Sequence, residues 1–233
     1  MDSTLLLIPG LAADRTMWRD QLSGLADYGP LVTDVAARHP SIPAMAAAML
    51  EEHPGKLVLC GASMGGMIAM EAARQAPDRI AGLALLGTNA NPETEEMRAL
   101  RESAIVLFEQ GRVTEVIAPN VALAFHPDHA LALAPEYLRF VLAAGADQLI
   151  RQNRAVITRP DARLHLARLE CPVLVMCGED DQLAPPGHSR QIAALCSNAK
   201  LVMVPRCGHM LTMERPDVVN ATLREWLQDA VGA

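Results

Sequence analysis

The sequence is poor in aromatic residues and has no excess of positive charge. Its 233 residues include three phenylalanines, two tyrosines and two tryptophans, which leaves little surface on which nucleic-acid bases could stack. Twenty lysines and arginines against 27 aspartates and glutamates give a formal net charge of −7. A chain with this charge and no basic patch is not expected to bind nucleic acid or an anionic membrane surface.

Long apolar runs are also lacking. The longest apolar stretches fall well short of the roughly 18 residues that a membrane-spanning helix needs, and no positive region of a signal peptide precedes the first apolar run. The five cysteines, at positions 60, 171, 177, 196 and 207, include no C-x-x-C pair. We therefore expect reduced thiols in a cytoplasmic protein without a membrane partner.

Short apolar runs alternate with helical patterns over much of the chain. Strand-like runs cover residues 4–8, 31–35, 57–60, 80–86, 172–177 and 200–204. Apolar strands that alternate with helices are typical of a parallel sheet with both faces buried. We therefore predict an α/β fold, with a mainly parallel sheet covered by helices on both faces.

The middle of the chain has a different pattern. From residue 91 to residue 159 the apolar residues follow helical spacing, as at Met97, Leu100, Ala104, Leu107 and Phe108. Glycines and prolines at 111, 119, 127, 135 and 145 are expected to divide this segment into short helices. Because strand-like runs resume at 172, we predict that the segment interrupts one domain whose core is residues 1–90 and 160–233.

One stretch joins an apolar strand to a helix through a glycine-flanked serine. The run 56–60 leads into Gly61-Ala-Ser63-Met-Gly65, and a helical pattern follows. G-x-S-x-G between a strand and a helix lifts the serine hydroxyl clear of the sheet, and glycine lets the two backbones pass closely. The helix N-terminus also favours negative charge that develops nearby. These features predict that Ser63 is a nucleophile.

A serine nucleophile needs a base, and the base needs an acid that orients it. His209 follows the last predicted strand in a short loop that contains glycine, whereas the other six of the seven histidines are expected to face solvent. Glu179, Asp180 and Asp181 follow the preceding strand, and spacing alone does not choose among them. In a parallel sheet these loops open on the edge where ligands bind. The histidine spacing predicts no metal site.

Three motifs together resemble the α/β-hydrolase superfamily: Gly61-Ala-Ser-Met-Gly-Gly66, Gly178-Glu-Asp-Asp181 with Pro185, and Gly208-His209 before Glu214-Arg-Pro-Asp217. The resemblance extends from Leu5 to Leu227 and implies that Asp181 is the acid. It also implies that the backbone N–H groups of Leu11 and Met64 form an oxyanion hole, and that residues 91–159 form a helical cap.

Two positions differ from the pattern of this family. Pro9 precedes Gly10, and Ala62 precedes Ser63, where the family often has histidine. Neither position supplies an oxyanion donor, because those donors are backbone N–H groups. The changes therefore leave the implied oxyanion donors in place, and the sequence leaves open how they affect the bracing of the pocket.

The resemblance implies a serine hydrolase that cleaves small to medium carboxylic esters through an acyl-enzyme, without cofactor or metal. Leu107, Phe108 and Phe125, with Met210 beside the base, are expected to line an apolar pocket, although such residues in a cap also pack on one another.

Two alternatives stay open, and the sequence indicates no oligomeric state. The same triad could cleave a lactone, a thioester or a carbon-carbon bond, with a carboxylate-binding arginine among Arg151, Arg154 and Arg159, for which surface roles are otherwise expected. A receptor could use the same cavity without turnover, because fold alone does not decide function.

Overall fold

The computed structural model describes residues 3–230 and 232, and these contain one six-stranded sheet. All its strand pairs are parallel, in the order β2-β1-β3-β4-β5-β6. The strands are β1 (Ser3–Ile8), β2 (Leu31–Val32), β3 (Lys56–Ala62), β4 (Ile80–Leu86), β5 (Val173–Gly178) and β6 (Ala199–Val204). The predicted α/β fold is confirmed.

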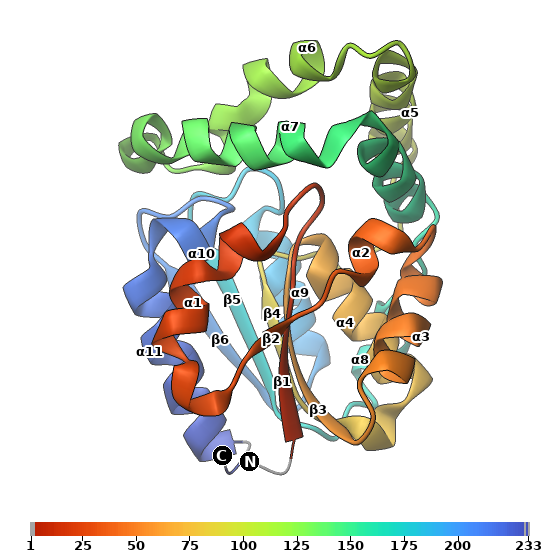
Figure 1. Cartoon of the computed structure of the whole chain (residues 1–233). Helices are drawn as coiled ribbons and strands as arrows, with labels where there is room; N and C mark the ends of the chain where they lie inside the picture. Colours follow the sequence, from red (N-terminus) through yellow and green to blue (C-terminus); the bar gives the residue numbers. More distant parts are fainter. Residues whose placement is uncertain (1–2, 231, 233) are drawn as a thin grey trace.

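Two buried apolar clusters lie on opposite faces of the sheet, because neighbouring strand residues point to opposite sides. Leu5 and Leu7 belong to one cluster, and Leu6 and Ile8 belong to the other. The first face is covered by η1 (Arg15–Trp18), α1 (Arg19–Gly24) and α11 (Pro216–Ala230), and the second by α3 (Ile42–Glu52), α4 (Met64–Gln75) and α9 (Pro186–Leu195). Figure 1 shows these layers on either side of the strands.

Short helices complete the connections: η2 (Ala26–Tyr28), α2 (Val35–Arg38), η3 (Pro77–Arg79), α8 (Arg163–Leu166) and α10 (Leu211–Glu214). The predicted strand 31–35 is wrong at its end. The strand β2 stops at Val32, and Val35 begins α2. As an edge strand, β2 pairs only with β1, and Val35 turns away to pack in the second cluster.

A layer of helices stands over the carboxyl ends of the strands (Figure 1). It consists of α5 (Glu95–Glu109), α6 (Val113–Ile117), η4 (Ala118–Ala124) and α7 (Pro127–Ile157), and we call residues 95–157 the helical layer. No helix in the described part of the chain, the long α7 included, is apolar enough over sufficient length to cross a membrane.

The prediction that prolines and glycines cut this segment into short helices is only partly correct. The helix α7 spans 31 residues, with Pro135 inside it, and its backbone departs from helical geometry at Gly145 (φ 75°, ψ 168°). Proline at 135 removes a hydrogen bond to residue 131. Leu131 is 92 % exposed, so this turn faces water and tolerates the loss.

The chain enters and leaves the helical layer through two adjacent segments. Ala162 N donates to Ala90 O at 2.9 Å, and Arg159 Nε donates to Asn91 O at 2.8 Å. These bonds hold the two segments side by side next to the sheet. The division of the chain into a core, residues 1–90 and 160–233, and a cap, residues 91–159, remains a prediction.

Candidate active site

Ser63 occupies a strained turn between β3 and α4. Its φ of 53° and ψ of −117° lie where few residues other than glycine are found. A Cβ atom on Gly61 would lie 2.3 Å from Gly65 O, and one on Gly65 would lie 2.0 Å from Ile8 O. Both glycines are therefore required for the close passage of β1, β3 and α4. The Ser63 N–H donates to Leu86 O at 2.9 Å, which fixes the turn against β4.

The loop after β1 lies beside Ser63. A Cβ atom on Gly10 would be 3.3 Å from Ser63 Cβ. Three amides of this loop have partners: Gly10 N with Met17 Sδ, Ala12 N with Gln152 Oε1, and Ala13 N with Gly10 O. Over residues 10–13 the Leu11 N–H alone has no acceptor within the described chain. Met64 opens α4, where an N–H has no partner in its own helix. Both amides are therefore available to an oxyanion.

Asp181 and His209 are joined by a hydrogen bond. Asp181 Oδ2 lies 2.8 Å from His209 Nδ1, and Asp181 Oδ1 accepts from the amides of Leu183 and Ala184 at 2.9 and 2.8 Å. The carboxylate is buried, whereas its rivals Glu179 and Asp180 are exposed. The geometry therefore places Asp181 as the partner of the imidazole. Because Nδ1 faces the carboxylate, Nε2 is the ring nitrogen left for a proton transfer.

The loop after β4 connects Ser63 to this pair. Thr88 Oγ1 donates to Ser63 O at 2.6 Å, and a Cβ atom on the neighbouring Gly87 would lie 3.2 Å from Asp181 Oδ2 and 3.5 Å from His209 Nδ1. In the described chain no hydrogen bond joins Ser63 Oγ to His209. Such bonds are often long without substrate. The structure thus brings acid and base together, and the loop after β4 lies against both this pair and the backbone of Ser63.

The predicted pocket residues serve mainly in packing. Phe108 and Phe125 are buried, and Phe125 meets Tyr137 edge-on, with ring centroids 5.5 Å apart. Burial also raises the pKa of Tyr137 to about 12. Leu107 is half-buried and Met210 is buried beside His209. That these side chains line a substrate pocket remains a prediction.

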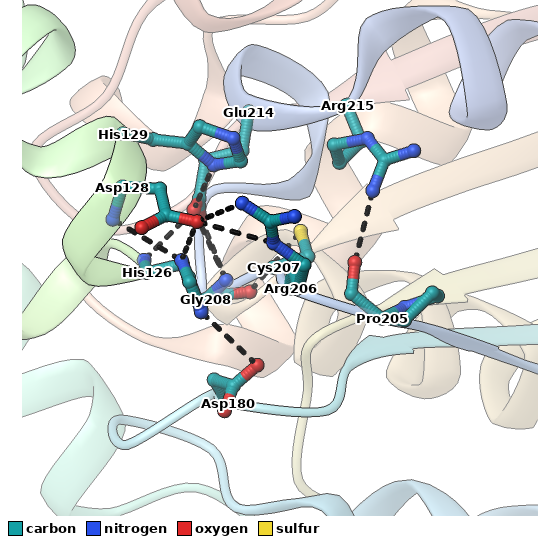
Figure 2. Close-up of polar contacts among 10 residues, drawn as sticks. All are labelled: His126, Asp128, His129, Asp180, Pro205, Arg206, Cys207, Gly208, Glu214 and Arg215. Atoms are coloured by element: carbon teal, nitrogen blue, oxygen red, sulfur yellow. Dashed lines mark hydrogen bonds and ion pairs between the residues drawn. The ribbon is translucent and has the colours of Figure 1, made fainter.

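The expectation that six histidines face solvent is only partly correct, because all six are half-buried. His165 Nε2 lies 3.1 Å from Met70 O, and His129 Nδ1 lies 3.0 Å from Glu214 Oε2. Glu214 is a buried residue that the sequence analysis assigned no role. Figure 2 shows it between the helical layer and the loop that carries His209. The one available signal was a glutamate in an otherwise uncharged four-residue helix, Leu211–Glu214.

The three arginines named as carboxylate binders have other partners. Arg159 is buried against Glu93, with Nη1 2.9 Å from Oε2, which corrects the expected surface role for this residue. Arg154 pairs with Glu109 at the surface at 2.7 Å, and Arg151 donates to the carbonyl of Ala37. Because the buried Arg159 guanidinium already contacts Glu93 and the carbonyl oxygens of Asn91 and Val156, that arginine is not free to bind a substrate carboxylate.

The cysteines are all free, and none lies in a reactive environment. Cys60, Cys177, Cys196 and Cys207 are buried, and Cys171 is half-buried. Burial raises the pKa of Cys177 and of Cys196 to about 11, so both stay protonated at neutral pH. No group of three or more histidine, cysteine or acidic side chains that could hold a metal occurs among the described residues.

Comparison with known proteins places the chain in one family. Residues 3–216 match the model of the alpha/beta hydrolase fold. "Putative carbamate hydrolase RutD" of Pseudomonas savastanoi pv. phaseolicola is 27 % identical over 250 residues, covering 96 % of this chain and 93 % of that protein. A thermophilic esterase from Thermogutta terrifontis superposes with a TM-score of 0.88 at 27 % identity, covering 98 % and 90 % of the two chains.

An enol-lactonase from Burkholderia xenovorans LB400 superposes with a TM-score of 0.86 at 21 % identity, covering 98 % of this chain and 93 % of that one. This identity shows a shared fold alone. The names of the carbamate hydrolase and the esterase describe hydrolysis of different bonds, so these two likenesses support a hydrolase without fixing its substrate. With its parallel sheet, its serine turn and its match over residues 3–216, the chain belongs to the α/β-hydrolase family.

Proposed function

We propose that this protein is a serine hydrolase that cleaves carboxylic esters of small to medium size. The observation that carries the proposal is the pair of buried Asp181 and half-buried His209, 2.8 Å apart, joined through the loop after β4 to a serine on a strained strand-to-helix turn. A serine, a buried acid and a histidine, in this order along the chain and in this setting, are the parts needed to activate a hydroxyl. The thermophilic esterase relative supports ester as the substrate class.

The reaction would begin when His209 Nε2 takes the proton of Ser63 and Ser63 Oγ attacks the carbonyl carbon. The backbone N–H groups of Leu11 and Met64 would bind the oxyanion, since they are the donors available at this point. Asp181 would stabilise the imidazolium. His209 would then protonate the leaving alcohol, and water, activated by the same ring, would release the acid from Ser63.

We further propose that residues 91–159 act as a cap over this site and residues 1–90 and 160–233 as the core. The position of the helical layer above the carboxyl ends of the strands supports this division (Figure 1). A second candidate function is cleavage of a related carbonyl, in a lactone or carbamate. It is favoured by the names of the two other relatives and needs no change in the triad.

The test is hydrolysis of p-nitrophenyl esters of increasing acyl length. Ser63→Ala should abolish turnover, and Asp181→Asn should lower kcat by roughly 10⁴-fold, the loss seen when a triad aspartate becomes asparagine. Asp180→Asn is the matched control, because Asp180 is the exposed neighbour, and it should retain activity.

A fluorophosphonate, which reacts with activated serines, separates the alternatives. Wild-type protein that is labelled at Ser63 yet inert towards every ester would keep the triad and move the substrate search to lactones and carbamates. Folded protein that is neither labelled nor active would contradict the enzymatic proposal and favour a receptor that uses the same fold.

A further inference from the structure

Glu214 is a fully buried carboxylate for which the proposed reaction has no step. Its side chain is 0 % exposed, and burying an ionised carboxylate is costly unless donors surround it. Four contacts supply hydrogen-bond donors to the Glu214 carboxylate. Gly208 N donates to Oε1 and Oε2 at 3.0 and 3.1 Å, His126 N donates to Oε2 at 2.8 Å, and His129 Nδ1 lies 3.0 Å from Oε2.

These donors come from two parts of the fold. Gly208 immediately precedes His209, whereas His126 and His129 lie at the start of α7 in the helical layer (Figure 2). Glu214 itself is the last residue of α10, the short helix that follows the His209 loop in the chain. One carboxylate therefore ties the peptide before the proposed base to the helix above it.

The same contact is reinforced by the backbone. His209 N and Met210 N both donate to Ala124 O, at 2.9 and 3.1 Å. A Cβ atom on Gly208 would lie 2.6 Å from the carbonyl carbon of Phe125, so the two backbones touch. Residues 124–129 and the His209 loop thus form one packed contact, with Glu214 at its buried centre.

The charged groups around the contact are more exposed. Arg206 pairs with Asp128, whose side chains are 75 % and 45 % exposed, and Asp180 Oδ2 lies 3.8 Å from His126 Nε2. Exposed pairs of this kind contribute little because solvent screens them. Figure 2 shows them beside the Glu214 contact, and they provide controls for it.

We propose that Glu214 is a positioning residue for the general base, and that it couples the position of His209 to the seating of the helical layer. Asp181 holds one end of the imidazole through Nδ1. The amides of residues 208–210 hold the backbone end. Without Glu214 the ring keeps its carboxylate partner but can pivot about that bond, away from Ser63. A displacement of about 1 Å at a reacting group can cost roughly 10²-fold in rate.

The variants separate charge, hydrogen bonding and bulk. Glu214→Gln keeps an oxygen that can replace Oε2, while Glu214→Leu keeps bulk but no acceptor. His129→Asn keeps a donor near the place of Nδ1, while His129→Ala removes it. Asp128→Asn breaks the exposed pair with Arg206 in the same cluster and is the matched control.

The inference rests on the proposed function for its kinetic readout, so a second readout is independent of turnover. For each variant, kcat and KM would be measured with the best p-nitrophenyl ester. The proton NMR signal of His209 Nδ1–H, held by Asp181, would be recorded in parallel and assigned with Asp181→Asn. Thermal denaturation would show which variants fold.

Glu214→Leu should lower kcat by roughly 10- to 100-fold with little change in KM, and should broaden or shift the Nδ1–H signal. Glu214→Gln and His129→Asn should recover most of the rate, His129→Ala should be intermediate, and Asp128→Asn should match wild type. If Glu214→Leu does not fold, the Gln, Asn and Ala variants give the same ranking.

Folded Glu214→Leu, or His129→Ala where the leucine variant fails, with wild-type kcat and an unchanged Nδ1–H signal would overturn the inference. The inference would also be overturned if Glu214→Leu and the control Asp128→Asn lowered kcat by the same factor. If no ester is cleaved by wild type, the proposed function fails, and the Nδ1–H signal alone then decides whether Glu214 positions His209.

Discussion

Replacing Glu93 with glutamine should destabilise the protein far more than the same change at Glu109. The Glu93 side chain is 4 % exposed and contacts two guanidinium groups, with Oε2 2.9 Å from Arg159 Nη1 and 2.6 Å from Arg101 Nε. Glu109 also meets an arginine, Arg154, at 2.7 Å, but it is 49 % exposed. The chemical change is identical at the two sites, so the comparison contrasts a buried carboxylate that has two arginine partners with an exposed one that has a single partner.

Breaking a buried ion pair costs about 3–5 kcal/mol, because the remaining charge is left without its partner. Arg159 would keep the carbonyl oxygens of Asn91 and Val156, at 2.8 and 2.9 Å, so we expect the lower end, about 3 kcal/mol. At about 2–4 °C per kcal/mol for a chain of this size, Tm should fall by roughly 6–12 °C. The exposed pair of Glu109 is worth about 0–1 kcal/mol.

The effect of Glu93 should also depend on pH. Burial raises the pKa of Glu93, but hydrogen bonds from Arg159 and Arg101 outweigh it, and the pKa lies below its ordinary value of 4.5. A carboxyl group with a lowered pKa in the folded protein stabilises it above the unfolded pKa, and this contribution is lost as pH falls through the folded value. The Tm difference between wild type and Glu93→Gln should therefore narrow below about pH 4.5.

Thermal denaturation followed by circular dichroism between about pH 3 and pH 8 measures both effects. Equal losses of Tm in Glu93→Gln and Glu109→Gln would refute the role assigned to burial. A gap between wild type and Glu93→Gln that stays constant through the acid range would refute the assignment of an ionised Glu93.

Three further results are expected. Gln152→Leu removes the acceptor for Ala12 N at 2.7 Å and should lower kcat for the best ester roughly tenfold at nearly constant KM. An unchanged kcat would show that the loop after β1 keeps its position without this hydrogen bond. Gly65→Ala places a Cβ 2.0 Å from a β1 carbonyl and should prevent correct folding, visible as lost near-UV circular dichroism, whereas a native spectrum would contradict the close passage at the serine turn. Native protein should react with iodoacetamide mainly at Cys171, the half-buried thiol, whereas urea-unfolded protein should react at all five cysteines. Intact mass counts the labels, and fast labelling of several thiols in the native protein would contradict their burial.

Much of the fold follows from local patterns. The strand Ile80–Leu86 has the predicted bounds, because buried parallel strands are continuous apolar runs. The edge strand β2 was predicted too long, since its apolar residues also continue into α2. A short apolar run does not show whether its residues pack in a strand or in the helix that follows.

The candidate site was predictable to the extent that its parts lie in short motifs. Ser63 and His209 each follow a predicted strand with glycine nearby, so their loops could be placed at one edge of the sheet. The choice of Asp181 over Asp180 depends on which way each side chain turns. Adjacent residues in a loop give no such direction from spacing, and here burial and the bond to His209 decide it.

The residues that hold these loops in place could not be found in the same way. Gln152 reaches Ala12 across 140 residues of sequence, and His129 reaches Glu214 across 85. Each contact exists only because the helical layer folds back over the strand ends. Helical periodicity identifies which residues of α7 are apolar, but it does not show which polar residue meets a loop below.

The helical layer contacts two separate loops of the candidate site. The helical layer supplies Gln152 to the loop after β1 and His129 to the contact at Glu214, so both the proposed oxyanion donor and the proposed base are seated against it. A helical layer grafted from a relative would keep Ser63, Asp181 and His209 yet lose both contacts unless their partners were grafted too. We expect such a chimera to regain activity only when residues equivalent to Gln152 and His129 are restored together, because each seats a different half of the catalytic machinery.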